Sequence, residues 1–180
     1  MPASVFRPFP GGRPSRRPVR VRANAKSFAK SLKAQGIPVE GDPADDYTDT
    51  HQVLIRVKSF GPGMAVARRL EDNNIVTNYQ ALPDDETFLD SSGVRMGVQE
   101  MTRFGMSAGD FDVLAGYVAD CVVRGKTVRD EVRAFRRNFL EMKYCLPASE
   151  ALSLAARVFA SAVPYPDFAA KFAENLEKLA

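Results

Sequence analysis

The residues that favour β-strands are confined to three short runs, all of them before residue 98. In residues 51–58, three β-branched side chains alternate with other residues, which is the pattern of a half-buried strand. Residues 75–80 and 94–96 predict two more short strands. The other apolar residues follow helical spacing, so the chain can build only a small sheet that helices must cover.

Helical segments account for most of the chain outside these runs. Ser107 and Thr127 each stand three residues before an aspartate, a capping-box signature that predicts the start of a helix. Gly61-Pro62-Gly63 predicts another helix start, because proline is tolerated in a first turn. Helices are expected near residues 21–35, 63–74, 107–125, 127–142, 149–162 and 167–179.

The order of these elements predicts an α+β fold. We expect a two-layer sandwich in which helices cover one face of a small, three-stranded, mainly antiparallel sheet. The domain organisation expected is an arm over residues 1–20, a folded domain over residues 21–146 and a helical C-terminal extension over residues 147–180.

Basic and acidic residues are divided unevenly along the chain. Nine basic residues and no acidic residue precede Glu40, whereas the rest of the chain carries 16 basic and 22 acidic residues. Residues 1–20 also contain five of the twelve prolines and no apolar periodicity, so we expect a disordered Pro/Arg-rich arm there. Three interpretations of this arm stay open: a nucleic-acid contact, an organelle-targeting peptide, and an accidental start unrelated to the fold.

The composition excludes several classes of protein. A chain of 180 residues has about the size of one domain, and no apolar run approaches the roughly 18–20 residues of a membrane span. Two cysteines and a single histidine exclude a disulfide scaffold, a multi-cysteine zinc site and a histidine-rich metal site. The sequence shows no secretory h-region, so we expect a cytoplasmic protein.

Two other groups of side chains have ordinary structural interpretations. Cys121 lies on the apolar side of its expected helix, so we expect a buried thiol. A solvated helix face is expected for the arginines that repeat at helical spacing among acidic residues, namely Arg129, Arg133, Arg136 and Arg137.

Arg95 stands inside the third expected strand, between two apolar residues and the flanking Gly93 and Gly97. An arginine in an apolar strand needs a partner, because its guanidinium keeps its charge and an unpaired buried charge is costly. The planar fork of the guanidinium suits a carboxylate bound through two hydrogen bonds. That carboxylate belongs either to a ligand or to a neighbouring acidic residue, for which the candidates are Asp84, Asp85 and Asp90.

Several short motifs around and before Arg95 occur in a fixed order. Residues 92–97 read S-G-V-R-M-G and residues 100–106 read E-M-T-R-F-G-M. Upstream lie N-A-K-x-x-A, T-D-T-H-Q-V-L and N-N-I-V-T-N-Y. Over residues 21–145 this series resembles the C-terminal small domain of the serine hydroxymethyltransferase-like family, which are pyridoxal-phosphate enzymes of the aspartate aminotransferase fold.

This resemblance implies a substrate-binding role for Arg95, because the matching arginine of the family clamps the α-carboxylate of the amino-acid substrate. Ser92 and Gly93 belong to the same motif and His51 to an upstream one, so these three are possible site-adjacent residues. The resemblance implies no catalytic residue, cofactor-binding residue or metal ligand in this chain. Departures from the family pattern occur at Gln80, Val98, Gln99 and Phe104. They put folate use in doubt and favour relatives such as threonine-type aldolases or transaldolases.

The family chemistry also needs a Schiff-base lysine and an aspartate that pairs with the pyridine nitrogen. In the family both belong to a large domain that precedes the matched region, and none of the eight lysines here lies in such a motif. The resemblance therefore implies the C-terminal domain of a glycine hydroxymethyltransferase or aldolase, a transferase of glycine/serine or threonine aldol-type chemistry. We expect this chain to contribute the carboxylate arginine, to bind no pyridoxal 5′-phosphate alone and to be inactive alone.

Two kinds of partner follow from this interpretation. The first is the amino-acid substrate of the parent family, together with a full-length homologue or a separate large domain. The alternative is a non-catalytic interaction module, which would dock on a full-length relative or, through the basic arm, on nucleic acid. We expect no membrane contact.

Overall fold

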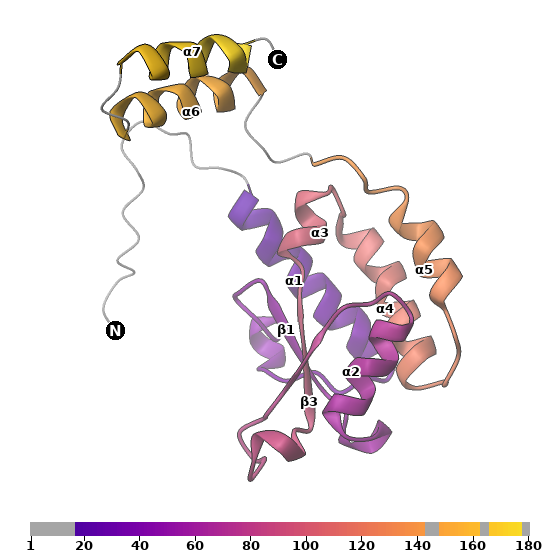
Figure 1. Cartoon of the computed structure of the whole chain (residues 1–180). Coiled ribbons are helices and arrows are strands. Elements are labelled where there is room, and N and C mark those ends of the chain that lie inside the picture. The colour runs from indigo at the N-terminus through magenta and orange to yellow at the C-terminus, as the bar shows by residue number, and fades with distance from the viewer. Residues whose placement is uncertain (1–16, 143–147, 163–165, 178–180) are drawn as a thin grey trace. The chain divides into compact units, whose positions relative to one another are not determined.

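Figure 1 shows the computed structural model of the chain, which describes residues 17–142, 148–162 and 166–177. The chain divides into two compact units, Met1–Lys143 and Tyr144–Ala180. The second unit contains two helices that pack against each other, α6 (Ala148–Ala162) and α7 (Pro166–Glu177).

The first unit contains both strands and helices. Its strands are β1 (Gln52–Arg56), β2 (Asn78–Gln80) and β3 (Gly93–Gly97). Its helices are α1 (Arg17–Ala34), α2 (Gly63–Asp72), α3 (Gln99–Arg103), α4 (Ala108–Val122) and α5 (Arg129–Arg136). Short 3-10 turns lie at Pro43–Asp45, Lys58–Phe60 and Phe88–Asp90.

The described strands form one antiparallel sheet in the order β1-β3-β2, so that β3 is the central strand. Leu54 of β1 and Asn78 of β2 both pair with Arg95 of β3. Residues that pair directly point to the same face of a sheet, so these three lie on one face, which we call the outer face. The opposite, inner face carries the buried side chains of Val53, Ile55, Val94 and Met96.

Helices pack on the inner face and complete the core (Figure 1). Helix α1 packs against α4, where the rings of Phe28 and Phe111 lie 5.4 Å apart between centroids. Helix α2 contacts β2, β3 and α4, and α1 also contacts β1. This arrangement confirms the predicted α+β class with a small antiparallel sheet and helices on one face.

Two buried asparagines join these elements. The Asn24 side-chain amide on α1 donates hydrogen bonds to Thr102 Oγ1 at 2.9 Å and to the Met106 carbonyl at 3.0 Å. Asn73, just after α2, accepts a hydrogen bond from the backbone N–H of Val128 at 2.6 Å. The Asn24 side chain therefore joins α1 to the segment that follows β3, and the Asn73 side chain joins the end of α2 to the segment that precedes α5.

One predicted capping box is confirmed and the other is wrong. The Asp110 carboxylate accepts hydrogen bonds from the Ser107 backbone N–H at 2.8 Å and from its hydroxyl at 2.6 Å, at the start of α4. Thr127 does not cap α5, which begins after Val128 without a side-chain cap. The physical reason is tertiary, because the Asn73 side chain accepts from the Val128 N–H instead.

Several element boundaries also differ from the sequence predictions, and the helix expected over residues 127–142 covers only Arg129–Arg136. Helix α1 begins at Arg17, so the last four residues of the predicted disordered arm are helical, while residues 1–16 of that arm lie outside the described residues. The second strand covers only the end of the predicted segment 75–80. Ile75, the first residue of the predicted segment, lies outside the strand and donates its backbone N–H to the Leu70 carbonyl near the end of α2.

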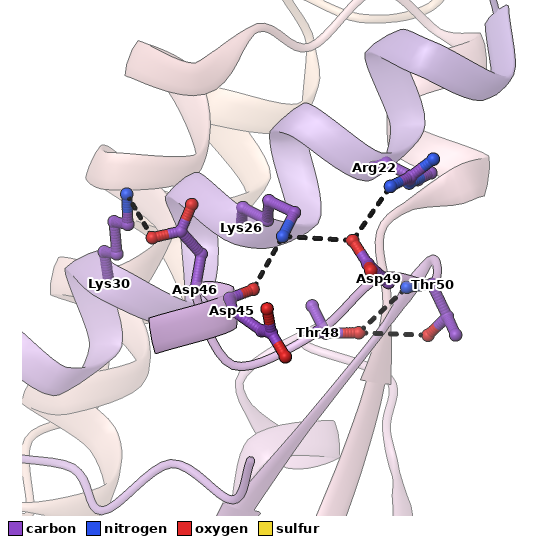
Figure 2. Close-up of polar contacts among 8 residues, drawn as sticks. All are labelled: Arg22, Lys26, Lys30, Asp45, Asp46, Thr48, Asp49 and Thr50. Carbon is purple, nitrogen blue, oxygen red and sulfur yellow. Dashed lines mark hydrogen bonds and ion pairs between the residues drawn. The ribbon is translucent and has the colours of Figure 1, made fainter. Parts of the chain in front are cut away.

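Basic residues on α1 bind the acidic loop that precedes β1 (Figure 2). Arg22 and Lys26 contact the Asp49 carboxylate at 2.8 and 3.1 Å, and Lys30 contacts Asp46 at 2.7 Å. The hydrogen bond from Arg22 lowers the pKa of Asp49, and the hydrogen bond from Lys30 lowers that of Asp46. These ion pairs lie at the surface and contribute little stability each, but they neutralise part of the basic N-terminal charge within the unit.

Among the described residues, none of the helices is long and apolar enough to cross a lipid bilayer.

Candidate functional site

The outer face of the sheet carries polar side chains, including two arginines. Arg56 of β1 pairs with Gly93, and Arg95 lies two residues further along β3, so both arginines point to the same face. Both are half-buried. Arg56 binds carboxylates of the chain, whereas the side chain of Arg95 lines a pocket.

Arg56 is fully engaged by two carboxylates. Its Nε donates to Glu40 at 2.8 Å, and its two terminal nitrogens donate to Asp84 at 2.7 and 3.0 Å. The Asp84 and Glu40 carboxylates raise the pKa of Arg56, and Arg56 in turn lowers the pKa of Asp84. Because Gly93 has no side chain, Arg56 can reach across β3 to the segment that follows β2.

Asp85 closes the loop between β2 and β3. Its carboxylate accepts hydrogen bonds from the backbone N–H groups of Leu82 and Ser92, each at 2.8 Å. These bonds, that of Leu82 first, lower the pKa of Asp85 to about 2. The loop is therefore held in place from within by Asp85 and from β1 by Arg56.

The side chain of Arg95, in contrast, makes no hydrogen bond or salt bridge with any residue in the described part of the chain. Of the acidic residues that the sequence offered as partners, Asp84 binds Arg56 and Asp85 binds backbone N–H groups. Asp90 has no ion pair with Arg95 either. The interpretation of Arg95 as one half of an internal ion pair is therefore wrong for these residues.

A small pocket of about 130 Å³ lies beside Arg95. Both predicted residues His51 and Arg95 line it. The remaining lining residues are neutral and come from β1, β2 with its lead-in, and the turn into α3: Gln52, Val76, Thr77, Asn78, Gly97 and Gln99. One unpaired guanidinium among neutral polar groups can bind a carboxylate through two charge-assisted hydrogen bonds.

The other two predicted site residues do not line this pocket. Ser92 is buried, and its backbone N–H is bound by Asp85. Gly93 lies where β2 comes close, since a Cβ there would stand 2.7 Å from the Gln80 carbonyl oxygen. Both residues support the loop and the strand rather than the pocket wall.

Sequence reasoning missed three amides that line the pocket, those of Gln52, Asn78 and Gln99. Only strand register could have found the first two, because it places Asn78 directly beside Arg95 and Gln52 beside Gly97. The sequence marks Gln99 only as a departure from the family pattern.

Two structural interpretations of other residues are confirmed. The N–H of Gly63, at the start of α2, donates to the Ser91 carbonyl at 2.8 Å, so the glycine-rich segment begins a helix and does not offer this N–H to an anion. Cys121 is buried on α4, and its burial raises the pKa of the thiol.

The fold is that of a small α+β domain, and Arg95 on its central strand lines a pocket of mostly polar residues. A model of the serine hydroxymethyltransferase family matches residues 16–118, more than half of the chain. The chain belongs to the serine hydroxymethyltransferase family.

Relatives from archaea are similar over most of this chain. A serine hydroxymethyltransferase of Pyrobaculum aerophilum is 46% identical over 128 residues, which cover 69% of this chain and 29% of the relative. That of Pyrobaculum calidifontis is 42% identical over 145 residues, covering 79% and 33%. The chain thus spans about a third of the length of these relatives.

A solved structure shows a similar fold. The L-threonine transaldolase of Pseudomonas fluorescens, in its internal aldimine state, superposes with a TM-score of 0.63 at 27% sequence identity. The match covers 80% of this chain and 33% of the transaldolase.

The residues around Arg95 do not fit the family cofactor, pyridoxal 5′-phosphate. That group needs a lysine for its aldehyde and a carboxylate for its pyridine nitrogen. Among the described residues, the lining of the pocket includes neither a lysine nor a carboxylate. The described lining of this pocket therefore offers neither of the two groups that the cofactor needs.

Proposed function

We propose that this chain is the substrate-carboxylate-binding part of a serine hydroxymethyltransferase-like enzyme of glycine/serine or threonine aldol-type chemistry. Arg95 is the residue that binds the carboxylate. The observation that carries the proposal is the guanidinium of Arg95, which lines a pocket of neutral polar groups and has no acidic partner among the described residues.

The neighbouring contacts support this role. Arg56 already holds two carboxylates, so it is not available to a ligand. Arg95 lies on the central strand β3, which is hydrogen-bonded to β1 on one side and to β2 on the other. This pairing fixes the backbone position from which the Arg95 side chain extends. A ligand carboxylate would find its cation already placed, with amide groups from β1 and β2 within the same pocket.

The test follows the guanidinium resonances of the full 180-residue chain by ¹⁵N NMR while glycine or acetate is added. We expect the Nε–H signal of Arg95 to shift saturably, with a dissociation constant on the order of 10 mM, because two charge-assisted hydrogen bonds act in a site open to water. Acetamide, which has no charge, should cause no saturable shift.

Arg56 is the matched internal control. Its Nε–H is already bound to Glu40, so its signal should not follow the ligand. The variant Arg95→Lys should lose the bidentate mode and weaken binding several-fold. Equal shifts at Arg56 and Arg95, or no saturable shift at Arg95, would contradict the proposal.

We further propose that the 180-residue chain alone neither binds pyridoxal 5′-phosphate covalently nor turns over serine or threonine. The lack of a lysine in the pocket supports this. The experiment adds the cofactor to the chain, treats it with borohydride and searches by mass spectrometry for a modified lysine. A trapped lysine adduct together with turnover of either amino acid would defeat this part of the proposal.

We propose that the cofactor-binding part comes from a separate large domain or from a full-length homologue. The chain spans about a third of the length of the two Pyrobaculum relatives. Size-exclusion chromatography with the full-length Pyrobaculum aerophilum enzyme tests docking on a relative, and co-elution at a defined stoichiometry is the expected result. Retention on nucleic acid that falls steeply with salt would instead favour the nucleic-acid alternative.

A further inference from the structure

The side chain of Gln99 folds back over the end of the central strand. Gly97 is the last residue of β3, and a Cβ built on it would stand 2.5 Å from Gln99 Oε1 and 3.0 Å from Gln99 Nε2. The Gln99 amide therefore occupies the space that a side chain at position 97 would take. Glycine is the residue type that leaves this space free, because it has no Cβ.

This position puts the Gln99 amide on the outer face of the sheet, next to Arg95. Residues 95 and 97 are two apart on one strand, so the space above Gly97 lies on the same face as the Arg95 side chain. Arg95, Gly97 and Gln99 all line the pocket of about 130 Å³. Gln52 pairs with Gly97 across the strands and adds a second amide to the same wall.

Hydrogen bonds hold the turn that carries Gln99. The backbone N–H of Val98 donates to the His51 carbonyl, just before β1, at 3.0 Å. The Thr102 hydroxyl donates to the Val98 carbonyl at 2.7 Å and accepts from the buried amide of Asn24 at 2.9 Å. The backbone from which the Gln99 side chain extends is therefore tied to β1 and, through Thr102, to α1.

The Gln99 amide is available to a ligand. Its side chain is exposed and makes no hydrogen bond with any residue in the described part of the chain. A primary amide offers two N–H donors, and an ionised carboxylate offers about four acceptor sites. A guanidinium that binds both carboxylate oxygens through two N–H groups leaves sites for a further donor.

We propose that Gln99 is a second carboxylate-binding residue, whose amide donates a hydrogen bond to the carboxylate that Arg95 binds. Gly97 is then a positioning residue, because it acts only through the space that it leaves to the amide. This inference rests on the proposed role of Arg95, and it assigns the affinity for the carboxylate to two side chains instead of one.

The experiment titrates the full 180-residue chain with acetate at constant ionic strength, because acetate has a carboxylate and no other polar group. NMR with ¹⁵N follows the Nε–H of Arg95 and the side-chain amide of Gln99. Both signals should shift saturably with the same dissociation constant. The side-chain amide of Gln35, which is exposed after α1 and does not line the pocket, should not follow the ligand.

The variant Gln99→Met keeps the length of the side chain and removes the donor. We expect it to weaken acetate binding roughly tenfold, because a hydrogen bond to a charged group is lost. The matched control Gln35→Met should bind acetate like the unaltered chain. A role of Gln99 in packing alone would leave the affinity of Gln99→Met unchanged.

The variant Gly97→Ala tests the same contact from the strand. Its Cβ would displace the Gln99 amide, so acetate binding should weaken by a similar factor. The fold should be kept, since Gly97 lies outside the left-handed φ region and the new Cβ meets the end of a flexible, exposed side chain. In the Gln99→Met background, Gly97→Ala should have no further effect, because the donor is already gone.

The outcomes separate this inference from the role of Arg95. A saturable shift at Arg95 with unchanged affinity in Gln99→Met would overturn the role of Gln99 and leave that of Arg95 intact. Additive effects of Gln99→Met and Gly97→Ala would overturn the positioning role of Gly97. No saturable shift at Arg95 in the unaltered chain would refute the role of Arg95 and, with it, that of Gln99.

Discussion

Replacing Asn24 with alanine should cost more stability than any surface change in this chain. Asn24 is 3% exposed, and its amide donates to Thr102 Oγ1 and to the Met106 carbonyl. The substitution removes two hydrogen bonds and leaves two buried acceptors without this donor, and Thr102 and Met106 are themselves at most 1% exposed. We expect a loss of about 2–3 kcal/mol in the free energy of unfolding.

Urea unfolding followed by tyrosine fluorescence and circular dichroism measures this loss. A double-mutant cycle with Thr102→Val isolates the pair and should give a coupling free energy of about 1 kcal/mol. The control Asn138→Ala changes an exposed asparagine and should stay within about 0.5 kcal/mol. If Asn24→Ala also stayed within that limit, the reasoning that this amide fixes α1 to the segment after β3 would be refuted.

Three further predictions concern the loop beside the site. The pKa of Asp85 is lowered to about 2, so its stabilising contribution is present above about pH 4 and is lost as the pH falls towards 2. Asp85→Asn should therefore reduce the acid-induced loss of stability between pH 5 and 2.5, and an unchanged acid dependence would contradict this. In Arg56→Lys, one ammonium group cannot bind both Glu40 and Asp84 as the guanidinium does, so hydrogen–deuterium exchange over residues 82–92 should become faster. Unchanged exchange would contradict the role of Arg56 in holding this loop. Gly93→Ala places a Cβ 2.7 Å from the Gln80 carbonyl oxygen and should destabilise the chain by about 1–3 kcal/mol, while Gly109→Ala, which meets nothing within 4 Å, should not.

Local sequence patterns predicted those parts of the fold in which neighbouring residues decide the structure. The capping box at Ser107 formed because both of its partners lie within one turn. The one at Thr127 failed because Asn73, more than fifty residues away in sequence, takes the Val128 N–H. Residue spacing cannot reveal a competitor that arrives through the tertiary fold.

The same limit applies to the candidate site. The glycines around Arg95 and its place in an apolar run were enough to select it from the sequence, and His51 came with the family motif. Which acidic residue would bind which arginine could not be decided from the sequence, because Arg56 and Arg95 carry the same guanidinium group and Asp84 contacts only one of them. Strand register decides this, since Arg56 lies opposite Gly93 and next to the loop.

The position of Arg95 in the middle of the sheet has a consequence for its energetics. Backbone hydrogen bonds hold the central strand from two sides, so the main chain at this residue has little freedom left to lose when a ligand arrives. Only the side-chain torsions remain to be frozen. An arginine on an edge strand or a surface loop would lose more main-chain entropy on forming two hydrogen bonds to a carboxylate, and would therefore bind that carboxylate more weakly.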